Sequence, residues 1–193
     1  AQMIEHYPNQ KCLGGGEESF GYMVGDFVRD KDAVTATLLA CELVLEAKSN
    51  GTSFFNVLLE AYEKLGCFQE RLFSLVKKGK SGAEEIDNIM DRFRKAPPNQ
   101  IDGSPTLFIE DYTTGVRSIV KNQEKEMISL PKANVLIFIA EDGTRIAARP
   151  SGTEPKIKFY VSVNTPLNST HNYRMIKDQL DKKMDRVLAE LGI

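Results

Sequence analysis

The sequence predicts an α+β fold: an antiparallel sheet with helices, preceded by the end of an α/β domain. Two long apolar helix patterns occupy residues 33–65. Short strand patterns joined by turn residues follow in residues 105–163. The composition changes between them, near residues 66–82. We therefore place a domain boundary there and expect one domain at 1–68 and the next at 69–193.

The first helix pattern covers residues 33–50 and ends at Gly51. Asp30 or Asp32 is placed to accept hydrogen bonds from the first amide groups, and glycine commonly follows a last helical turn. The apolar side chains form a broad face, which predicts a well-buried helix. They are Val34, Leu38, Leu39, Cys41, Val44 and Leu45.

Two further helices are predicted at 54–65 and 83–95. Thr52 or Ser53 can begin the earlier one. Two consecutive prolines end the later one, because proline lacks the amide hydrogen that a helix needs.

The remaining patterns alternate between apolar and polar residues, as strands do when one face is buried. Strands are predicted at 70–76, 105–112, 116–120, 134–142, 144–149 and 156–163, with a turn at 77–82. Asp142-Gly143 is a strong hairpin sequence, and Thr113–Gly115 forms a second turn. A final helix is predicted at 169–191.

The composition excludes several classes of protein. With 193 residues, 41% hydrophobic residues and a formal net charge of -2, the chain has no basic field to attract nucleic acid. No apolar run approaches the ~18 residues of a membrane span. The 3 cysteines are widely spaced, which argues against a zinc site or a disulfide framework and favours a reducing cytoplasm.

The stretch RPSGTEPK (149–156) combines several kinds of anion-binding donor between two strands. Arg149 offers a planar fork of N–H groups, while Ser151 and Thr153 add hydroxyls. Gly152 lets the backbone approach a ligand closely, and Lys156 adds a further charge. These features favour a phosphate-binding loop; an ordinary surface turn is the alternative.

The stretch GGGEESFG (14–21) combines three glycines with two adjacent acids. Glu17 can accept hydrogen bonds from sugar hydroxyls, and Ser19 can donate or accept them. The alternative is a loop with solvated acids. A metal site is not expected, because the further oxygen ligands that a calcium loop needs are missing.

Taken together, four stretches resemble the α-D-phosphohexomutases, the phosphoglucomutase/phosphomannomutase family. They are GGGEESFG, VRDKDAV, EDYTTG and DGTRIAARPSGTEPKIKFYV. Members of that family have four domains around one cleft. The chain resembles the end of the third domain followed by the complete fourth, which has a TATA-binding-protein-like fold.

The resemblance implies a reaction that moves a phosphoryl group between carbons one and six of a hexose, through a phosphoserine and glucose 1,6-bisphosphate. Glu17 and Ser19 would then bind the hydroxyls on carbons three and four, which exchange places when the sugar turns over. The residues that would hold the phosphate that is not transferred are Arg149, Ser151, Gly152 and Thr153. Lys31 matches a family lysine near the transferring phosphate, or it is a solvated lysine at a helix start.

The family's catalytic parts are absent from the sequence. Neither the TASHNP-like serine loop nor the DGDxDR-like loop that holds Mg²⁺ occurs. We therefore expect no catalytic residue, no metal ligand and no mutase activity in this chain. The missing N-terminal domains of the same protein are its expected partners, with hexose phosphate as substrate.

The form GEESFG favours glucose, although mannose or ribose phosphate remains an alternative within the family. A non-catalytic phosphosugar-binding module is the alternative outside the enzymes. The chain also reaches its first motif after only 13 residues, which indicates a start inside a domain. Such a start would expose the apolar face of the helix at 33–50, so we expect self-association.

Overall fold

The computed structural model describes residues 4–5, 9–17, 21–77 and 81–192. The chain divides into two compact units, residues 1–60 and 61–193, and each is described by itself. Together they hold helices and a large antiparallel sheet, which confirms the predicted α+β class.

The first unit contains a short hairpin of β1 (Gly14–Gly16) and β2 (Tyr22–Val24). Two of the three glycines, expected in a loop, lie where the strands approach closely. A Cβ on Gly16 would lie 2.9 Å from the Tyr22 ring, and one on Gly14 would lie 2.8 Å from the Met23 carbonyl oxygen. The lack of a side chain at these two positions therefore permits strand pairing here.

Helix α2 (Ala33–Ser49) begins at Asp32, whose carboxylate accepts a hydrogen bond from the Val34 amide at 3.1 Å. The neighbouring Asp30 instead pairs with Lys31. Ala47 is the one buried residue in this helix. The expectation of a well-buried helix was therefore wrong for the described chain, where the small hairpin covers little of an apolar surface that extends around α2.

Helix α3 (Phe54–Leu65) spans the division between the units. Ser53 begins it, because its hydroxyl accepts a hydrogen bond from the Asn56 amide at 3.1 Å. Gly66 ends the helix with a φ of 96°, a backbone conformation that favours glycine. The chain then enters the sheet of the second unit.

The second unit is built on an eight-stranded antiparallel sheet with the order β3-β10-β9-β8-β5-β6-β7, and β4 pairs with β5. The strands are β3 (Cys67–Val76), β4 (Gln100–Ile101), β5 (Ser104–Asp111), β6 (Val116–Ile119), β7 (Lys125–Met127), β8 (Leu136–Ala140), β9 (Arg145–Pro150) and β10 (Lys156–Thr165). Strand β3 begins earlier than expected, and β8 is shorter. The Asp142-Gly143 turn joins β8 to β9 as predicted, with Gly143 at a φ of 83°.

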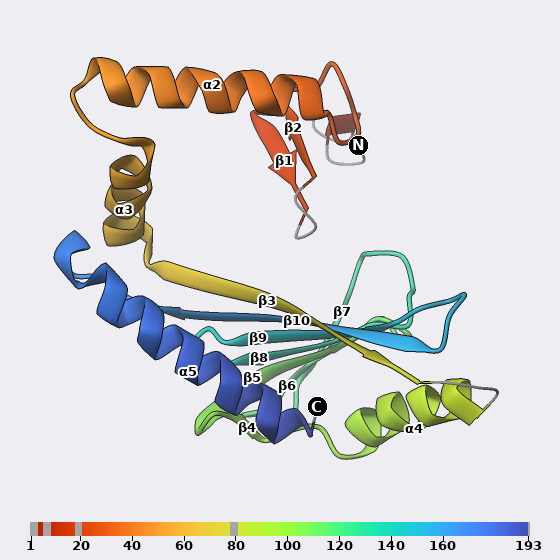
Figure 1. The fold of residues 1–193 in the computed structure, drawn as a ribbon. Coiled ribbons are helices and arrows are strands. Elements are labelled where there is room, and N and C mark those ends of the chain that lie inside the picture. The colour runs from red at the N-terminus through yellow and green to blue at the C-terminus, as the bar shows by residue number, and fades with distance from the viewer. Residues whose placement is uncertain (1–3, 6–8, 18–20, 78–80, 193) are drawn as a thin grey trace. The chain divides into compact units, whose positions relative to one another are not determined.

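Helices α4 (Ser81–Lys95) and α5 (Tyr173–Leu191) pack on one face of this sheet (Figure 1). Their buried side chains join those of the strands in one core. Along β10 the buried residues alternate with partly exposed ones. The core members from these elements include Ile86, Met90, Phe93, Phe138, Ile146, Ala148, Ile157, Phe159, Val161, Val163, Leu180, Met184, Val187 and Leu191.

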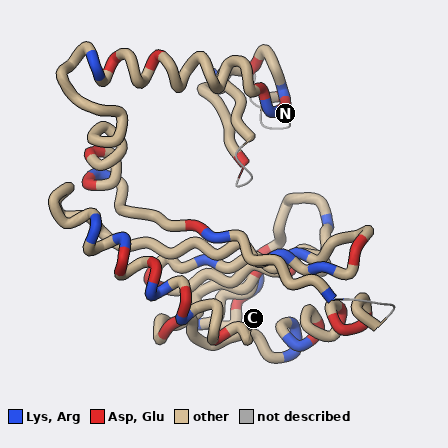
Figure 2. The backbone as a smooth tube through the Cα atoms, viewed as in Figure 1, with Lys and Arg blue, Asp and Glu red and all other residues tan. Residues whose placement is uncertain are grey.

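The final helix differs slightly from its predicted span. A short 3₁₀ turn, η1 (Thr170–Asn172), precedes α5, and the Ser169 hydroxyl accepts a hydrogen bond from the His171 amide. Gly192 ends α5 in the left-handed conformation. Lys, Arg, Asp and Glu are interspersed along α5, so its surface has no single-sign field (Figure 2).

The EDYTTG stretch ends β5 and forms the turn to β6. Glu110 is 4% exposed, and its carboxylate accepts hydrogen bonds from Arg117 at 2.8 and 2.5 Å. The Tyr112 hydroxyl donates to the same carboxylate at 3.1 Å. The buried carboxylate of Glu110 therefore links Tyr112 and Arg117 and stabilises this stretch.

We predict that Arg117→Ala lowers the free energy of unfolding by about 2–3 kcal/mol, because Glu110 would keep a buried charge without its main partner. Chemical denaturation of the chain measures this. Lys121→Ala, at an exposed position between β6 and β7, is the control and should change stability by less than about 0.5 kcal/mol. Equal effects of the two substitutions would contradict the prediction.

The apolar side chains of α2 are exposed in the described chain: Val34 by 79%, Leu38 by 60% and Leu45 by 66%. We predict concentration-dependent self-association of the chain, and its weakening by Leu38→Glu. Thr37→Glu, the preceding position of α2, adds the same charge without removing an apolar side chain. Sedimentation velocity that shows a monomer at all concentrations, or equal effects of both substitutions, would count against this.

Candidate functional site

The RPSGTEP stretch connects β9 to β10 at one end of the sheet. Ile146 and Ala148 of β9 point into the helix-covered core, so Arg149 lies on the opposite face. Lys158 of β10 lies on that same face and is the register partner of Arg149. Two cations therefore stand side by side at the base of the loop, where directly opposed like charges are unfavourable.

Neither cation has a direct partner, although the carboxylate of Glu154 attracts Lys158 from a distance and that attraction helps to lower the pKa of Glu154. Among the residues that the structure describes, none forms a hydrogen bond or ion pair with the side chain of Arg149 or Lys158. An anion with several oxygens would relieve the repulsion between them and take donors from both. The sequence analysis missed Lys158. The strand alternation in KIKFYV, counted from the buried Phe159, could have placed it on the face of Arg149.

The loop itself is closed by hydrogen bonds between its own residues. The Ser151 amide donates to the Lys156 carbonyl at 2.7 Å. The Ser151 hydroxyl oxygen accepts from the amides of Thr153 and Glu154 at 3.4 and 3.3 Å. A Cβ on Gly152 would meet nothing within 4 Å, so the space beside this backbone is open. Ser151, Gly152 and Thr153 thus lie together on one bent, accessible backbone segment.

The sequence indicated that Lys156 would add a further positive charge to the loop, but in the structure this charge is not free. Its ammonium group pairs with the carboxylate of Glu154 at 2.9 Å. This hydrogen bond holds the pKa of Glu154 below its usual value. The pair is local and solvent-exposed on the Glu154 side, and it places a negative charge beside the candidate anion site.

In the first unit, Glu17 and Lys31 form an ion pair, which is a second candidate site. The Lys31 ammonium lies 3.2 Å from the Glu17 carboxylate and 2.9 Å from that of Asp30. Both hydrogen bonds raise the pKa of Lys31, and the bond to Asp30 has the larger effect. The stem of Lys31 lies over Gly21, where a Cβ would come within 2.2 Å of its Cδ. Glycine at this position lets the lysine reach back to Glu17.

Ser19 lies outside the described residues. The Glu17–Lys31 pair and the loop at 149–156 also belong to different units, so each is a separate candidate site here. No group of three or more His, Cys, Asp or Glu that could hold a metal ion occurs among the residues that the structure describes. Likewise, no helix within the described ranges is long and apolar enough to cross a membrane.

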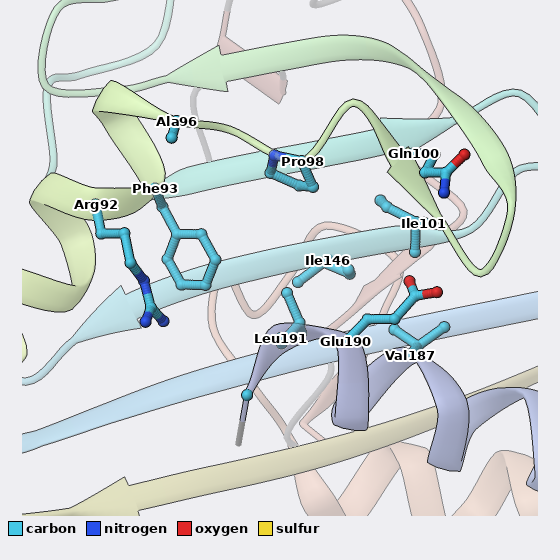
Figure 3. A pocket seen from close by; sticks show the side chains of 11 residues that line it. Arg92, Phe93, Ala96, Pro98, Gln100, Ile101, Ile146, Val187, Glu190 and Leu191 are labelled. Carbon is cyan, nitrogen blue, oxygen red and sulfur yellow. The ribbon is translucent and has the colours of Figure 1, made fainter.

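A pocket of about 540 Å³ lies elsewhere in the second unit (Figure 3). Its floor consists of core side chains such as Phe93, Ile146 and Val187, and Arg92 and Glu190 lie at its rim. None of residues 149–156 lines it. Its apolar floor does not suit a phosphosugar, so the loop is the better candidate for the anion.

Comparison with known proteins agrees with the geometry. Residues 1–64 match the phosphoglucomutase/phosphomannomutase alpha/beta/alpha domain III, and residues 110–167 match the C-terminal domain of the same family. The chain belongs to the phosphoglucomutase/phosphomannomutase family. It contains the equivalents of domains III and IV, in the order that the family motifs indicated.

Named relatives give the same result. The chain is 41% identical over 165 residues to a phosphoglucomutase from Staphylococcus epidermidis, which covers 85% of this chain and 30% of that protein. A phosphoglucomutase from Staphylococcus aureus is 39% identical over 165 residues, covering 86% and 29%. The chain thus spans about 30% of the length of these family members.

A solved structure shows the same fold. It is the open form of the exocytosis-sensitive phosphoprotein pp63/parafusin, a phosphoglucomutase from Paramecium, with a TM-score of 0.54 and 16% identity. The match covers 93% of this chain and 31% of the other.

We predict that Glu154→Gln tightens binding of inorganic phosphate to the loop about threefold to tenfold. The substitution removes a negative charge near the anion and releases the Lys156 ammonium group. NMR titration of the labelled chain measures the affinity. Glu141→Gln, at the turn between β8 and β9, is the control and should leave it unchanged; unchanged or weaker binding in Glu154→Gln would refute this prediction.

Proposed function

We propose that this chain is the substrate-holding part of a phosphoglucomutase, and that its loop at 149–156 binds the phosphate that is not being transferred. The observation that carries the proposal is the pair of adjacent cations, Arg149 and Lys158, which form no direct ion pair among the described residues and stand at the base of an open loop. A phosphate dianion fits this arrangement, because it accepts the guanidinium fork and the ammonium together.

Binding at the loop would serve catalysis through orientation. A phosphate held by Arg149, Ser151, Gly152 and Thr153 fixes one end of the sugar and presents the distant hydroxyl for attack. Interactions with the non-reacting end lower the barrier by converting binding energy into position. Glu17 and Ser19 would contribute by binding the sugar hydroxyls on carbons three and four, and Lys31 by approaching the transferring phosphate.

The sugar is glucose in this proposal. Its support is the name shared by the relatives at 39–41% identity, phosphoglucomutase. Glucose and mannose differ at carbon two, which the Glu17 loop is not expected to contact. A comparison of glucose, mannose and ribose phosphates as substrates of the whole enzyme tests this. A preference for mannose or ribose phosphate would contradict the proposal.

The Mg²⁺ that the family uses does not fit the described residues, which supply no ligand group for it. We propose that the ion and the phosphoserine are held by other domains of the same protein. A reducing, cytoplasmic setting is also proposed, supported by the free thiols of Cys12, Cys41 and Cys67.

The test is an NMR titration of the labelled chain with glucose 1-phosphate and, separately, with inorganic phosphate. We expect shifts centred on 149–156 and at least a tenfold loss of affinity in Arg149→Ala, about 1.4 kcal/mol. Arg145→Ala removes an exposed arginine from the same strand and face, and should bind normally. Equal losses in both variants would mean that only general positive charge is sensed, and the loop assignment would fail.

The chain alone should also lack mutase activity. We expect no conversion of glucose 1-phosphate to glucose 6-phosphate above background in a dehydrogenase-coupled assay, with or without added Mg²⁺ and glucose 1,6-bisphosphate. The physical reason is that no phosphoserine loop occurs in the sequence. Turnover by the purified chain would overturn this part of the proposal.

A further inference from the structure

The phosphate loop is attached at its far end to a residue outside its motif. Beyond the last β3–β10 register pair, Val76 and Lys156, the Lys77 amide donates a hydrogen bond to the Pro155 carbonyl at 2.9 Å. Pro155 belongs to the RPSGTEP stretch, whereas Lys77 follows strand β3. The backbone of Lys77 therefore holds one end of the loop in place.

Helix α4 presses on the same residue. Gly82, in the first turn of α4, is buried. A Cβ at this position would lie 2.9 Å from the Lys77 Cβ, 3.0 Å from its carbonyl carbon and 3.1 Å from its carbonyl oxygen. The Lys77 ammonium also pairs with Glu85 of α4 at 3.1 Å. Helix, Lys77 and loop thus form one continuous chain of contacts.

Glycine at position 82 needs an explanation, because glycine inside a helix is about 1 kcal/mol less favourable than alanine. Its backbone is not in the left-handed region that requires glycine. Space is the remaining reason: two of the three close atoms belong to the Lys77 backbone, which cannot rotate away as a side chain can. A larger residue would push Lys77, and with it the hydrogen bond to Pro155.

We infer that Lys77 and Gly82 are positioning residues that set the place of the phosphate loop through backbone contact with helix α4. The inference rests on the proposed function of the loop, but not on any direct contact of Lys77 or Gly82 with the substrate. In this inference the backbone amide of Lys77 positions the loop, and the side chain of Lys77, which pairs with Glu85, is not needed for that.

The test compares two substitutions at one position of the 193-residue chain. Lys77→Ala keeps the amide hydrogen, and Lys77→Pro removes it. Val76 before it is already in a strand, a conformation that a following proline permits. We expect Lys77→Pro to move the amide resonances of 151–155 without ligand and to weaken inorganic phosphate binding about tenfold or more. Lys77→Ala should do neither.

Gly82→Ala should reproduce the effect of Lys77→Pro from the helix side, while Ser81→Ala, its exposed neighbour in α4, should not. Methyl resonances of Ile146 and Val187 in the core report whether each variant keeps its fold. Shifts confined to the loop with an unchanged core support the inference.

Three outcomes overturn it: normal phosphate binding in Lys77→Pro, equal effects of Lys77→Ala and Lys77→Pro, or normal binding in Gly82→Ala. Arg149→Ala distinguishes the two proposals. If that variant loses affinity and the positioning variants do not, this inference fails while the proposed function stands. If Arg149→Ala binds normally, the proposed function itself is wrong.

Discussion

The packing of α4 and α5 against one face of the sheet decides the direction of every side chain in the β9–β10 hairpin (Figure 1). Ile157 and Phe159 are 0% and 1% exposed and point into that core. Successive strand residues point to opposite faces, so Lys158 must point away from it. A register slip of one residue would bury the lysine and expose the aromatic ring. The core thus fixes the cations without touching them.

This constraint is the reason that we place the proposed anion site on the hairpin and not in the apolar pocket of Figure 3. Charges are most readily kept unpaired where water reaches them, on the open face of the sheet. The loop between the strands is already bent by the bonds of Ser151 before any ligand arrives. A preformed loop loses less conformational entropy on binding than a loose one. Arg149 lies on strand β9, so its backbone is also ordered before binding and loses little conformational entropy.

Three glycines outside the left-handed backbone region have distinct roles in this chain, and composition alone does not separate them. Gly16 permits close approach to an aromatic ring, Gly82 permits a helix to meet a backbone, and Gly152 leaves open space beside a loop. From the sequence all three are merely small residues. The differences come from what lies opposite each one, which depends on residues distant in the chain. The same holds for α2, whose apolar residues predicted burial although little of the described chain covers them.

The sequence by itself determined the α+β class, most element spans, the hairpin at Asp142-Gly143 and the family, through the RPSGTEP and GEES motifs. These depend on local periodicity, turn chemistry and short motifs, which are properties of neighbouring residues. Only the tertiary structure decided that Lys158 stands beside Arg149, that Glu154 neutralises Lys156, and that Lys77 holds Pro155. Each of these depends on strand register or loop geometry, and both are set by the packing of the whole sheet against its helices.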